Sequence, residues 1–336
     1  MKLYCRFMEE IVILSDGRIT TCCMDPLGEN AYASIAEVDF GTWREDYLRR
    51  FEAVMVDPGV MPRCATCFAR IKAAPETANQ YQKLFPDEET VRLGREAMAE
   101  CPRRVVIELS SVCNLKCRGC MQYRENIPAT RNEPLMDVDR LKDWMRGAAE
   151  TVHAIRLYNY GETFVHPRAV EFVEFAKGLG MFVEIATNGQ LLADAALRRR
   201  LMASGVDKLL FSIHGSDQRG AEGYMTDHFR FDLTMEILRD LVALRRELGA
   251  HTELYWKYLL FTWNDTDEDM DRAVALAREI GLDKVQFTLP GYPSPSRRFS
   301  GPPNRNVRVV NLAAERAAAP TSSSTSAAAK RPEARS

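Results

Sequence analysis

Three closely spaced cysteines are the residues of this 336-residue chain whose types and spacing point most directly to chemistry. They are Cys113, Cys117 and Cys120, and they follow an apolar run that ends at Leu109. Three thiolates this close together cannot all pair as disulfides. They can hold three corners of an iron–sulfur cube, which normally has four cysteine ligands. The missing fourth ligand leaves one iron open to react, whereas a structural zinc site requires four protein ligands. A zinc or redox knuckle is the alternative interpretation.

Downstream of the cysteines, β-branched segments alternate with amphipathic ones. The segments expected to be strands are 105–109, 155–159, 182–187, 208–213, 254–261 and 284–289. The segments expected to be helices are 137–150, 168–178, 193–203, 233–248 and 267–280. Strands that alternate with helices of roughly 10–15 residues predict an α/β fold with a parallel sheet. The cysteines then lie at the carboxyl end of the first strand, where βα barrels carry their active residues.

The cysteine spacing, the preceding strand and the missing fourth ligand resemble the radical S-adenosylmethionine (radical SAM) superfamily. The resemblance implies a partial (β/α)6 TIM-like barrel over residues 102–290. It also implies a 4Fe–4S cluster on the three cysteines that binds S-adenosylmethionine (SAM). An external reductant of the flavodoxin or ferredoxin type supplies one electron. SAM is then cleaved to a 5′-deoxyadenosyl radical, which abstracts hydrogen from a substrate.

The same resemblance suggests SAM contacts after later strands. The expected contacts are Gly161, Glu162, Asn188, Ser212 and Lys257. Each has a simpler alternative, such as a helix-start turn for the Gly-Glu pair, a turn at Asn188 or a solvated strand lysine. His214 is expected to be structural unless it faces the barrel mouth. Gly119 departs from the family pattern, which prefers an aromatic residue before the third cysteine, and the departure leaves the usual adenine packing in doubt.

The N-terminal segment, residues 1–75, carries its own group of cysteines. They are Cys5, Cys22, Cys23, Cys64 and Cys67. Asp16-Gly17 between apolar runs predicts a hairpin that would bring Cys5 near the Cys22/Cys23 pair. A helix is expected over 43–56, ended by Asp57-Pro58-Gly59.

This arrangement resembles a SPASM or twitch module with one auxiliary 4Fe–4S cluster, although such a module normally follows the barrel. A zinc-stapled subdomain is the alternative, and the choice between Cys22 and Cys23 stays open. Residues 76–101 are expected to form a helical connector, with Cys101 a buried thiol. Residues 291–336 are expected to be loop and disordered tail.

Composition excludes several classes of partner. The formal net charge is −2, with 45 basic and 47 acidic residues, so no basic footprint indicates nucleic acid. No run approaches the ~18 apolar residues of a membrane span. Nine cysteines without an export signal favour a reducing cytoplasm and metal binding over disulfides.

Absences narrow the expected reaction. No cysteine follows Cys120, so thiol-quenched epimerisation and dual-cysteine methylation are disfavoured unless Cys22, Cys23 or Cys101 reaches the site. No room for a cobalamin domain and no winged-helix segment are evident, which favours a small-molecule substrate. The reaction is then an oxidoreductase, lyase or C–C bond-forming step, by analogy with enzymes that act on sugars and nucleosides in antibiotic biosynthesis. A peptide maturase and a non-catalytic Fe–S or zinc sensor or electron carrier remain as alternatives.

Overall fold

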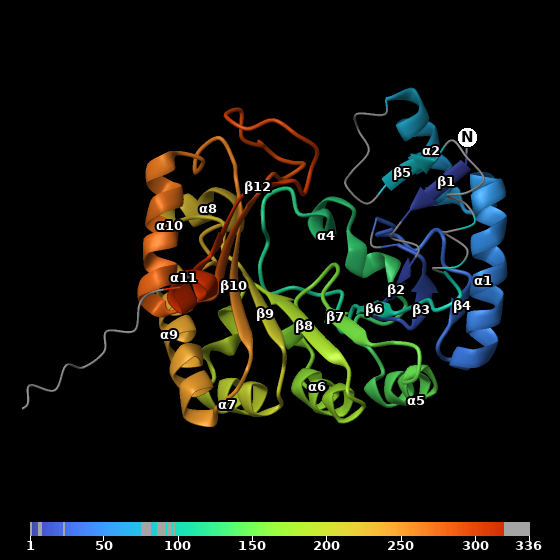
Figure 1. Cartoon of the computed structure of the whole chain (residues 1–336), viewed down its shortest axis with the longest axis horizontal. Coiled ribbons are helices and arrows are strands. Elements are labelled where there is room, and N and C mark those ends of the chain that lie inside the picture. Colours follow the sequence, from blue (N-terminus) through green and yellow to red (C-terminus); the bar gives the residue numbers. More distant parts are fainter. Residues whose placement is uncertain are drawn as a thin grey trace, which may run out of the picture.

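The structure is a computed structural model that describes residues 2–5, 9–22, 24–74, 82–85, 92, 96 and 98–318. Figure 1 shows the whole chain. Most of the expected connector over 76–101 and the tail beyond residue 318 lie outside the described residues, as does Cys23.

One curved sheet of ten strands forms the body of the chain, in the order β12-β11-β10-β9-β8-β7-β6-β2-β3-β4. Seven of these strands run parallel to one another, and apart from the N-terminal β2 (Glu10–Ile13) they are β6 (Arg104–Ile107), β7 (Ala154–Leu157), β8 (Phe182–Thr187), β9 (Lys208–Ser212), β10 (Glu253–Leu259) and β11 (Lys284–Thr288). The last six are the strands expected from the alternating pattern. Because the sheet has two ends, the barrel is partial, and the predicted α/β fold class is confirmed.

Helices cover the outer, convex face of this sheet (Figure 1). The five expected helices are present as α5 (Val138–Ala148), α6 (Ala169–Gly178), α7 (Ala195–Ala203), α9 (Phe231–Leu248) and α10 (Asp267–Ile280). Local chemistry explains their ends. Asp137, Asp194 and Thr266 each accept a backbone N–H in the first turn, and Gly249 and Gly281 adopt the left-handed conformation at the C-terminal end.

Shorter elements at the carboxyl ends of the strands were not expected from the sequence. They are α4 (Met121–Arg124), α8 (Gln218–Met225) and the 3-10 turns η4 (Ile127–Thr130), η5 (Thr163–Val165) and η6 (Gln190–Ala193). Isolated helices this short are marginal in water, so their sequences carry little periodic signal. They surround the edge where the parallel strands end, which is called the rim below.

The N-terminal segment continues the barrel sheet. The expected hairpin is formed by β2 (Glu10–Ile13) and β3 (Arg18–Thr20), followed by β4 (Ala33–Ser34). Strand β2 also pairs in parallel with β6, so one sheet runs across the expected boundary near residue 102.

The hairpin does not contain Cys5, contrary to the expectation. Cys5 lies on β1 (Lys2–Cys5), which pairs with β5 (Gln82–Phe85) in a separate two-stranded sheet. The first strand of the hairpin begins at Glu10, so Cys5 precedes the hairpin. The hairpin pairing therefore does not place Cys5 opposite the Cys22 end.

Helix α1 (Phe40–Val56) packs the N-terminal segment onto the barrel. It spans the expected helix and ends at Asp57, and the turn η2 (Pro58–Val60) and helix α2 (Pro62–Ala73) follow. Trp43 on α1 is buried and contacts Trp144 of α5 with ring centroids 5.5 Å apart. Such edge-to-face packing of large rings contributes substantially to a core.

The C-terminal part differs from the expected loop. Residues 306–311 form β12 (Asn306–Asn311), antiparallel to β11, and α11 (Leu312–Ala318) follows. The sequence did not predict this strand because it lies at the edge of the sheet and is largely exposed. Without a buried face, its residues do not alternate between apolar and polar as those of a half-buried strand do.

Candidate active site at the rim of the barrel

The three cysteines lie in the loop that leaves β6, and all three are half-buried and free. The loop is held at both ends by backbone contacts. Ser111 N donates to Pro134 O at 2.9 Å, and Arg118 N donates to Tyr224 O of α8 at 2.7 Å. Burial raises the pKa of all three thiols, that of Cys113 to about 12. The thiolate is the form that ligates a metal, so a metal that binds here would have to displace the thiol protons.

A buried polar network lies beneath the loop. Glu108 and Arg131 form an ion pair of 2.7 Å with both side chains fully buried. Asn159 Nδ2 donates to the other carboxylate oxygen of Glu108 at 2.7 Å, and Ser15 N donates to the first at 3.3 Å. This Glu108 network (Glu108, Arg131 and Asn159) joins the cysteine loop to the end of β7 and to the N-terminal hairpin. No sequence motif marks these three residues.

Gly161 and Glu162 lie against the cysteine loop. Glu162 N donates to Val112 O at 2.9 Å. Gly161 has φ +145°, and a Cβ there would lie 2.0 Å from Ser110 O, so only glycine allows this approach. The Gly-Glu pair is therefore a contact point between the ends of β6 and β7.

The carboxylate of Glu162 joins β7 to the end of β8. It is buried and accepts hydrogen bonds from Thr187 Oγ1 at 2.8 Å and Asn188 N at 2.9 Å. Burial raises its pKa, and these hydrogen bonds act in the opposite sense. Asn188 Nδ2 in turn donates to Asn114 Oδ1 at 2.9 Å and lies 3.8 Å from Cys113 Sγ. The structure thus brings together three of the expected site residues, Glu162, Asn188 and Cys113.

Ser212 and Lys257 are register partners on β9 and β10. The Lys257 ammonium has no hydrogen-bond or ion-pair partner among the described residues, and burial lowers its pKa. Next to this pair, His214 accepts a hydrogen bond from Leu259 N through Nδ1 at 3.2 Å. Burial lowers the pKa of His214 to about 3, so its ring is neutral and structural.

The N-terminal cysteines are partly assembled in the structure. Cys64 and Cys67 share one turn of α2, and the pKa of Cys64 is raised to about 11, mainly by burial and in part by Cys67. Asn30 Nδ2 lies 3.6 Å from Cys64 Sγ and 3.4 Å from Thr21 Oγ1, which precedes Cys22. Asn30 therefore connects the end of the hairpin to the Cys64 helix. Cys23 lies outside the described residues.

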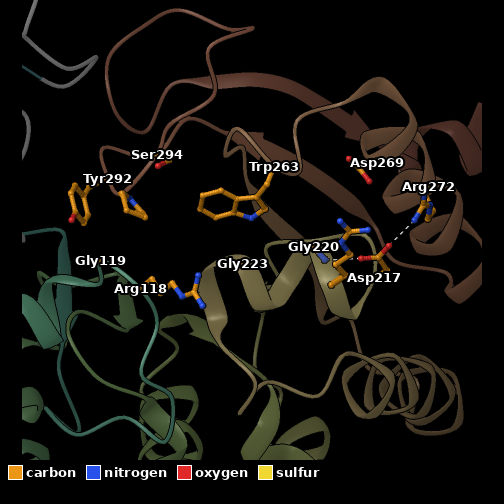
Figure 2. A pocket seen from close by; sticks show the side chains of 12 residues that line it. Arg118, Gly119, Asp217, Gly220, Gly223, Trp263, Asp269, Arg272, Tyr292 and Ser294 are labelled. Atoms are coloured by element: carbon orange, nitrogen blue, oxygen red, sulfur yellow. Dashed lines mark hydrogen bonds and ion pairs between the residues drawn. The ribbon is translucent and has the colours of Figure 1, made fainter.

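A cleft of about 830 Å³ opens beside the cysteine loop (Figure 2). It is bounded by the loop at Arg118 and Gly119, by α8, by the start of α10 and by the segment after β11. Its lining residues are Arg118, Gly119, Asp217, Arg219, Gly220, Gly223, Trp263, Asp269, Arg272, Tyr292, Pro293 and Ser294. The Tyr292 ring packs on Gly119, where an added Cβ would lie 2.3 Å from Cδ1. Tyr292, which is far from Gly119 in the sequence, thus covers this position without a side chain.

The model of the radical SAM superfamily matches residues 107–298, which is more than half of the chain. The chain belongs to the radical SAM superfamily.

Individual relatives of this radical SAM protein have different activities. It is 33% identical over 149 residues to the tungsten-containing aldehyde ferredoxin oxidoreductase cofactor-modifying protein of Pyrococcus furiosus, covering 43% of this chain and 40% of that protein. It is 26% identical over 226 residues to the PqqA peptide cyclase of Gluconobacter oxydans, covering 57% and 62%. The chain thus spans less than two thirds of either relative. SuiB of Streptococcus suis bound to precursor peptide SuiA is similar with TM-score 0.47 and 17% identity, covering 72% of this chain and 52% of SuiB.

The rim residues fit the cofactors of a radical SAM protein. Among the described residues, no three histidine, cysteine or carboxylate side chains are grouped so as to hold one metal ion. A cubic iron–sulfur cluster has a different requirement from a single metal ion. Each cysteine binds a separate iron, so the thiols lie further apart than the ligands of one ion. Cys113 and Cys120 are nevertheless close enough to Cys117 for their charges to raise its pKa. Three free, half-buried thiols in one loop can each supply one ligand to such a cluster.

Two aromatic residues of this candidate site were also not expected from the sequence. Tyr224 lies near Cys117 and Cys120, and burial together with these thiols raises its pKa. Tyr292 comes from a loop more than a hundred residues away from the cysteines. No motif marks either residue, and only the fold brings them to the rim.

Among the described helices, none is long and apolar enough to span a bilayer.

Proposed function

We propose that the chain is a radical SAM enzyme that abstracts hydrogen from a small-molecule substrate, of the kind that includes sugars and nucleosides. The observation that carries this proposal is the convergence of Cys113, Cys117 and Cys120 with Glu162 and Asn188 at the rim of a radical SAM barrel. When bound, a reduced 4Fe–4S cluster cleaves SAM to methionine and a 5′-deoxyadenosyl radical.

The chain's own residues would bind and orient the cofactor. The three rim thiols are the ligands, and the Glu108 network fixes the loop that presents them. Gly161 supplies close backbone approach, and Glu162 holds Asn188 toward Cys113. Positioning is the main task of such a site, because a primary radical reacts with whatever C–H bond lies nearest.

Lys257 and Ser212 are proposed to contact the polar end of SAM. Lys257 is half-buried, burial lowers its pKa and the charge of Glu184 acts in the opposite sense, so an anionic ligand group such as the SAM carboxylate would further stabilise the ammonium. The neutral ring of His214 beside them adds no competing charge.

An auxiliary 4Fe–4S cluster in the N-terminal segment is the second element of the proposal. Cys64, Cys67, Cys5 and one of Cys22 and Cys23 would supply its four ligands. Asn30, which connects Thr21 to Cys64, supports a shared site. A zinc ion at the same cysteines is the alternative. The electron donor to the rim cluster is proposed to be a flavodoxin or ferredoxin of the reducing cytoplasm.

A peptide substrate is the second candidate function. The observation in its favour is that the relative PqqA peptide cyclase matches 57% of this chain, a larger share than the cofactor-modifying relative matches. A precursor peptide encoded near this gene would favour this alternative over a small molecule.

The test is anaerobic reconstitution followed by reduction, addition of SAM and assay of 5′-deoxyadenosine, with iron and sulfide counted. About eight irons, 5′-deoxyadenosine formation and its loss in Cys117→Ala would support two clusters and radical chemistry. About four irons with activity would assign the N-terminal cysteines to zinc or structure. No 5′-deoxyadenosine at full loading would contradict the proposal and favour a sensor or electron carrier.

A further inference from the structure

Two aromatic side chains, Trp263 and Tyr292, line the cleft beside the cysteine loop (Figure 2). Trp263 is 38% exposed and Tyr292 is 51% exposed, which is unusual for such large apolar side chains. Trp263 stacks on Phe261 with centroids 4.7 Å apart, and its edge lies on Gly223, where an added Cβ would be 2.1 Å from Nε1. The indole is therefore fixed in place while one side of it remains open to the cleft.

Tyr292 is held in the same way on the opposite side. Its ring lies on Gly119, and the Arg124 guanidinium carbon lies 4.5 Å from the ring centroid. Rings that are already fixed lose little conformational entropy when a flat ligand packs on them. The two positions thus supply preorganised flat surface in a wet cleft.

Among the described residues that line the cleft, the charged side chains without a hydrogen-bond or ion-pair partner are positively charged. Asp217 is engaged by Arg272 at 2.8 Å and by Gly220 N at 2.7 Å. Asp269 accepts hydrogen bonds from Ser216 and Thr266. These carboxylates are therefore already used by the fold.

Arg118 and Arg219 differ from those carboxylates. Within the described residues, their guanidinium groups have no hydrogen-bond or ion-pair partner, and both line the cleft. A free guanidinium presents paired N–H donors that match the oxygens of a carboxylate or phosphate. Arg118 also lies between Cys117 and Cys120, so an anion bound there would lie beside the rim cysteines.

We propose that this cleft binds the substrate, a small molecule with a planar ring and one anionic group, either phosphate or carboxylate. Arg118 and Arg219 contact the anion, and Trp263 and Tyr292 pack against the ring. A volume of about 830 Å³ suits a ligand of nucleotide size, since ligand pockets span roughly 300–1,000 Å³. The inference rests on the proposed function and names the substrate class of that reaction.

Trp263 provides a direct readout of ligand binding. The other three tryptophans, Trp43, Trp144 and Trp256, are at most 4% exposed, so acrylamide quenching of the reconstituted protein reports mainly on Trp263. Four probes separate the recognition elements: uridine 5′-monophosphate, uridine, ribose 5-phosphate and benzoate. Saturable protection by uridine 5′-monophosphate is expected, with uridine at least tenfold weaker and ribose 5-phosphate giving little protection. Protection by benzoate would identify carboxylate, rather than phosphate, as an accepted anion.

The double variant Arg118→Gln/Arg219→Gln should weaken the anionic probe at least tenfold and leave uridine binding unchanged. Arg199→Gln is the matched control, because Arg199 pairs with Glu247 on the far side of the barrel. Equal binding of uridine and its monophosphate, or unchanged affinity in the double variant, would overturn the proposal. Mutual exclusion of the probe and SAM would assign the cleft to the cofactor and would also overturn it.

The same preparations separate this inference from the proposed function. If 5′-deoxyadenosine forms but no probe protects Trp263, the substrate-class inference fails alone. If a probe binds but SAM is not cleaved, radical chemistry fails, and with it the assignment of the bound molecule as a substrate.

Discussion

The two groups of cysteines in this chain are held in different ways. The rim cysteines, Cys113, Cys117 and Cys120, lie in a loop fixed by residues from the ends of other strands, including Glu108, Gly161 and Asn188. Of the N-terminal cysteines, Cys64 and Cys67 lie on one helix, and the amide of Asn30 connects Cys64 to Thr21 at the end of the hairpin. The rim site is thus built from the ends of several barrel strands, whereas the described contacts of Cys64 come from α2 itself and from the segment around Asn30. This difference predicts that the two sites respond to different substitutions.

The largest effect is expected from Arg131→Leu. Removing Arg131 leaves the carboxylate of Glu108 buried without its counter-ion, which typically costs about 3–5 kcal/mol in the free energy of unfolding. Urea denaturation measures this loss, and iron counting should show that the rim cluster is lost while N-terminal metal is retained. Arg200→Leu is the control, because its pair with Glu174 is half-exposed and is expected to cost less than about 1 kcal/mol. Equal losses in the two variants would show that the Glu108 network does not support the rim.

The next effect is expected from Gly161→Ala. A left-handed φ costs alanine about 1–2 kcal/mol, and the contact with Ser110 O adds overpacking of about 1–3 kcal/mol. Gly180→Ala is the matched control, since Gly180 has φ +77° but no atom within 4 Å of an added Cβ. Thermal unfolding should therefore separate the two variants, and only Gly161→Ala should reduce iron at the rim. If both variants behave alike, backbone strain explains the whole effect and the close approach contributes nothing.

How much of this comparison was predictable from the sequence depends on the separation of the residues involved. The six parallel strands and five helices follow from local periodicity, and Cys113, Cys117 and Cys120 follow from their spacing. The Glu108–Arg131 pair spans 23 positions and the Glu108–Asn159 contact spans 51, in segments with no shared pattern. Charged residues of this kind are normally expected on the surface, so only their burial in the fold reveals their role.

A smaller and more local effect is expected from Asn30→Ala. The Asn30 side chain accepts from Arg63 N at 3.0 Å and lies near Thr21 and Cys64, so its loss leaves buried groups unpaired at about 1–3 kcal/mol. Metal should be lost from the N-terminal cysteines alone, with SAM cleavage at the rim retained. Asn132→Ala is the control, because the side chain of Asn132 is exposed. Loss of rim iron in Asn30→Ala would show that the two cysteine sites assemble together.

The smallest effect is expected from Arg124→Gln, which tests how the segment after β11 is held to the rim. The change removes the cation–π contact with Tyr292, worth about 0.5–1 kcal/mol at an exposed site, but leaves the ring on Gly119. Hydrogen exchange of residues 290–298 should therefore accelerate about two- to fivefold, with no change in iron content. Lys116→Gln is the control on the same loop, since Lys116 faces Tyr123 instead. Unchanged exchange in Arg124→Gln would mean that the cation–π contact does not hold this segment. Packing of Tyr292 on Gly119 would then be the interaction that attaches the segment to the rim.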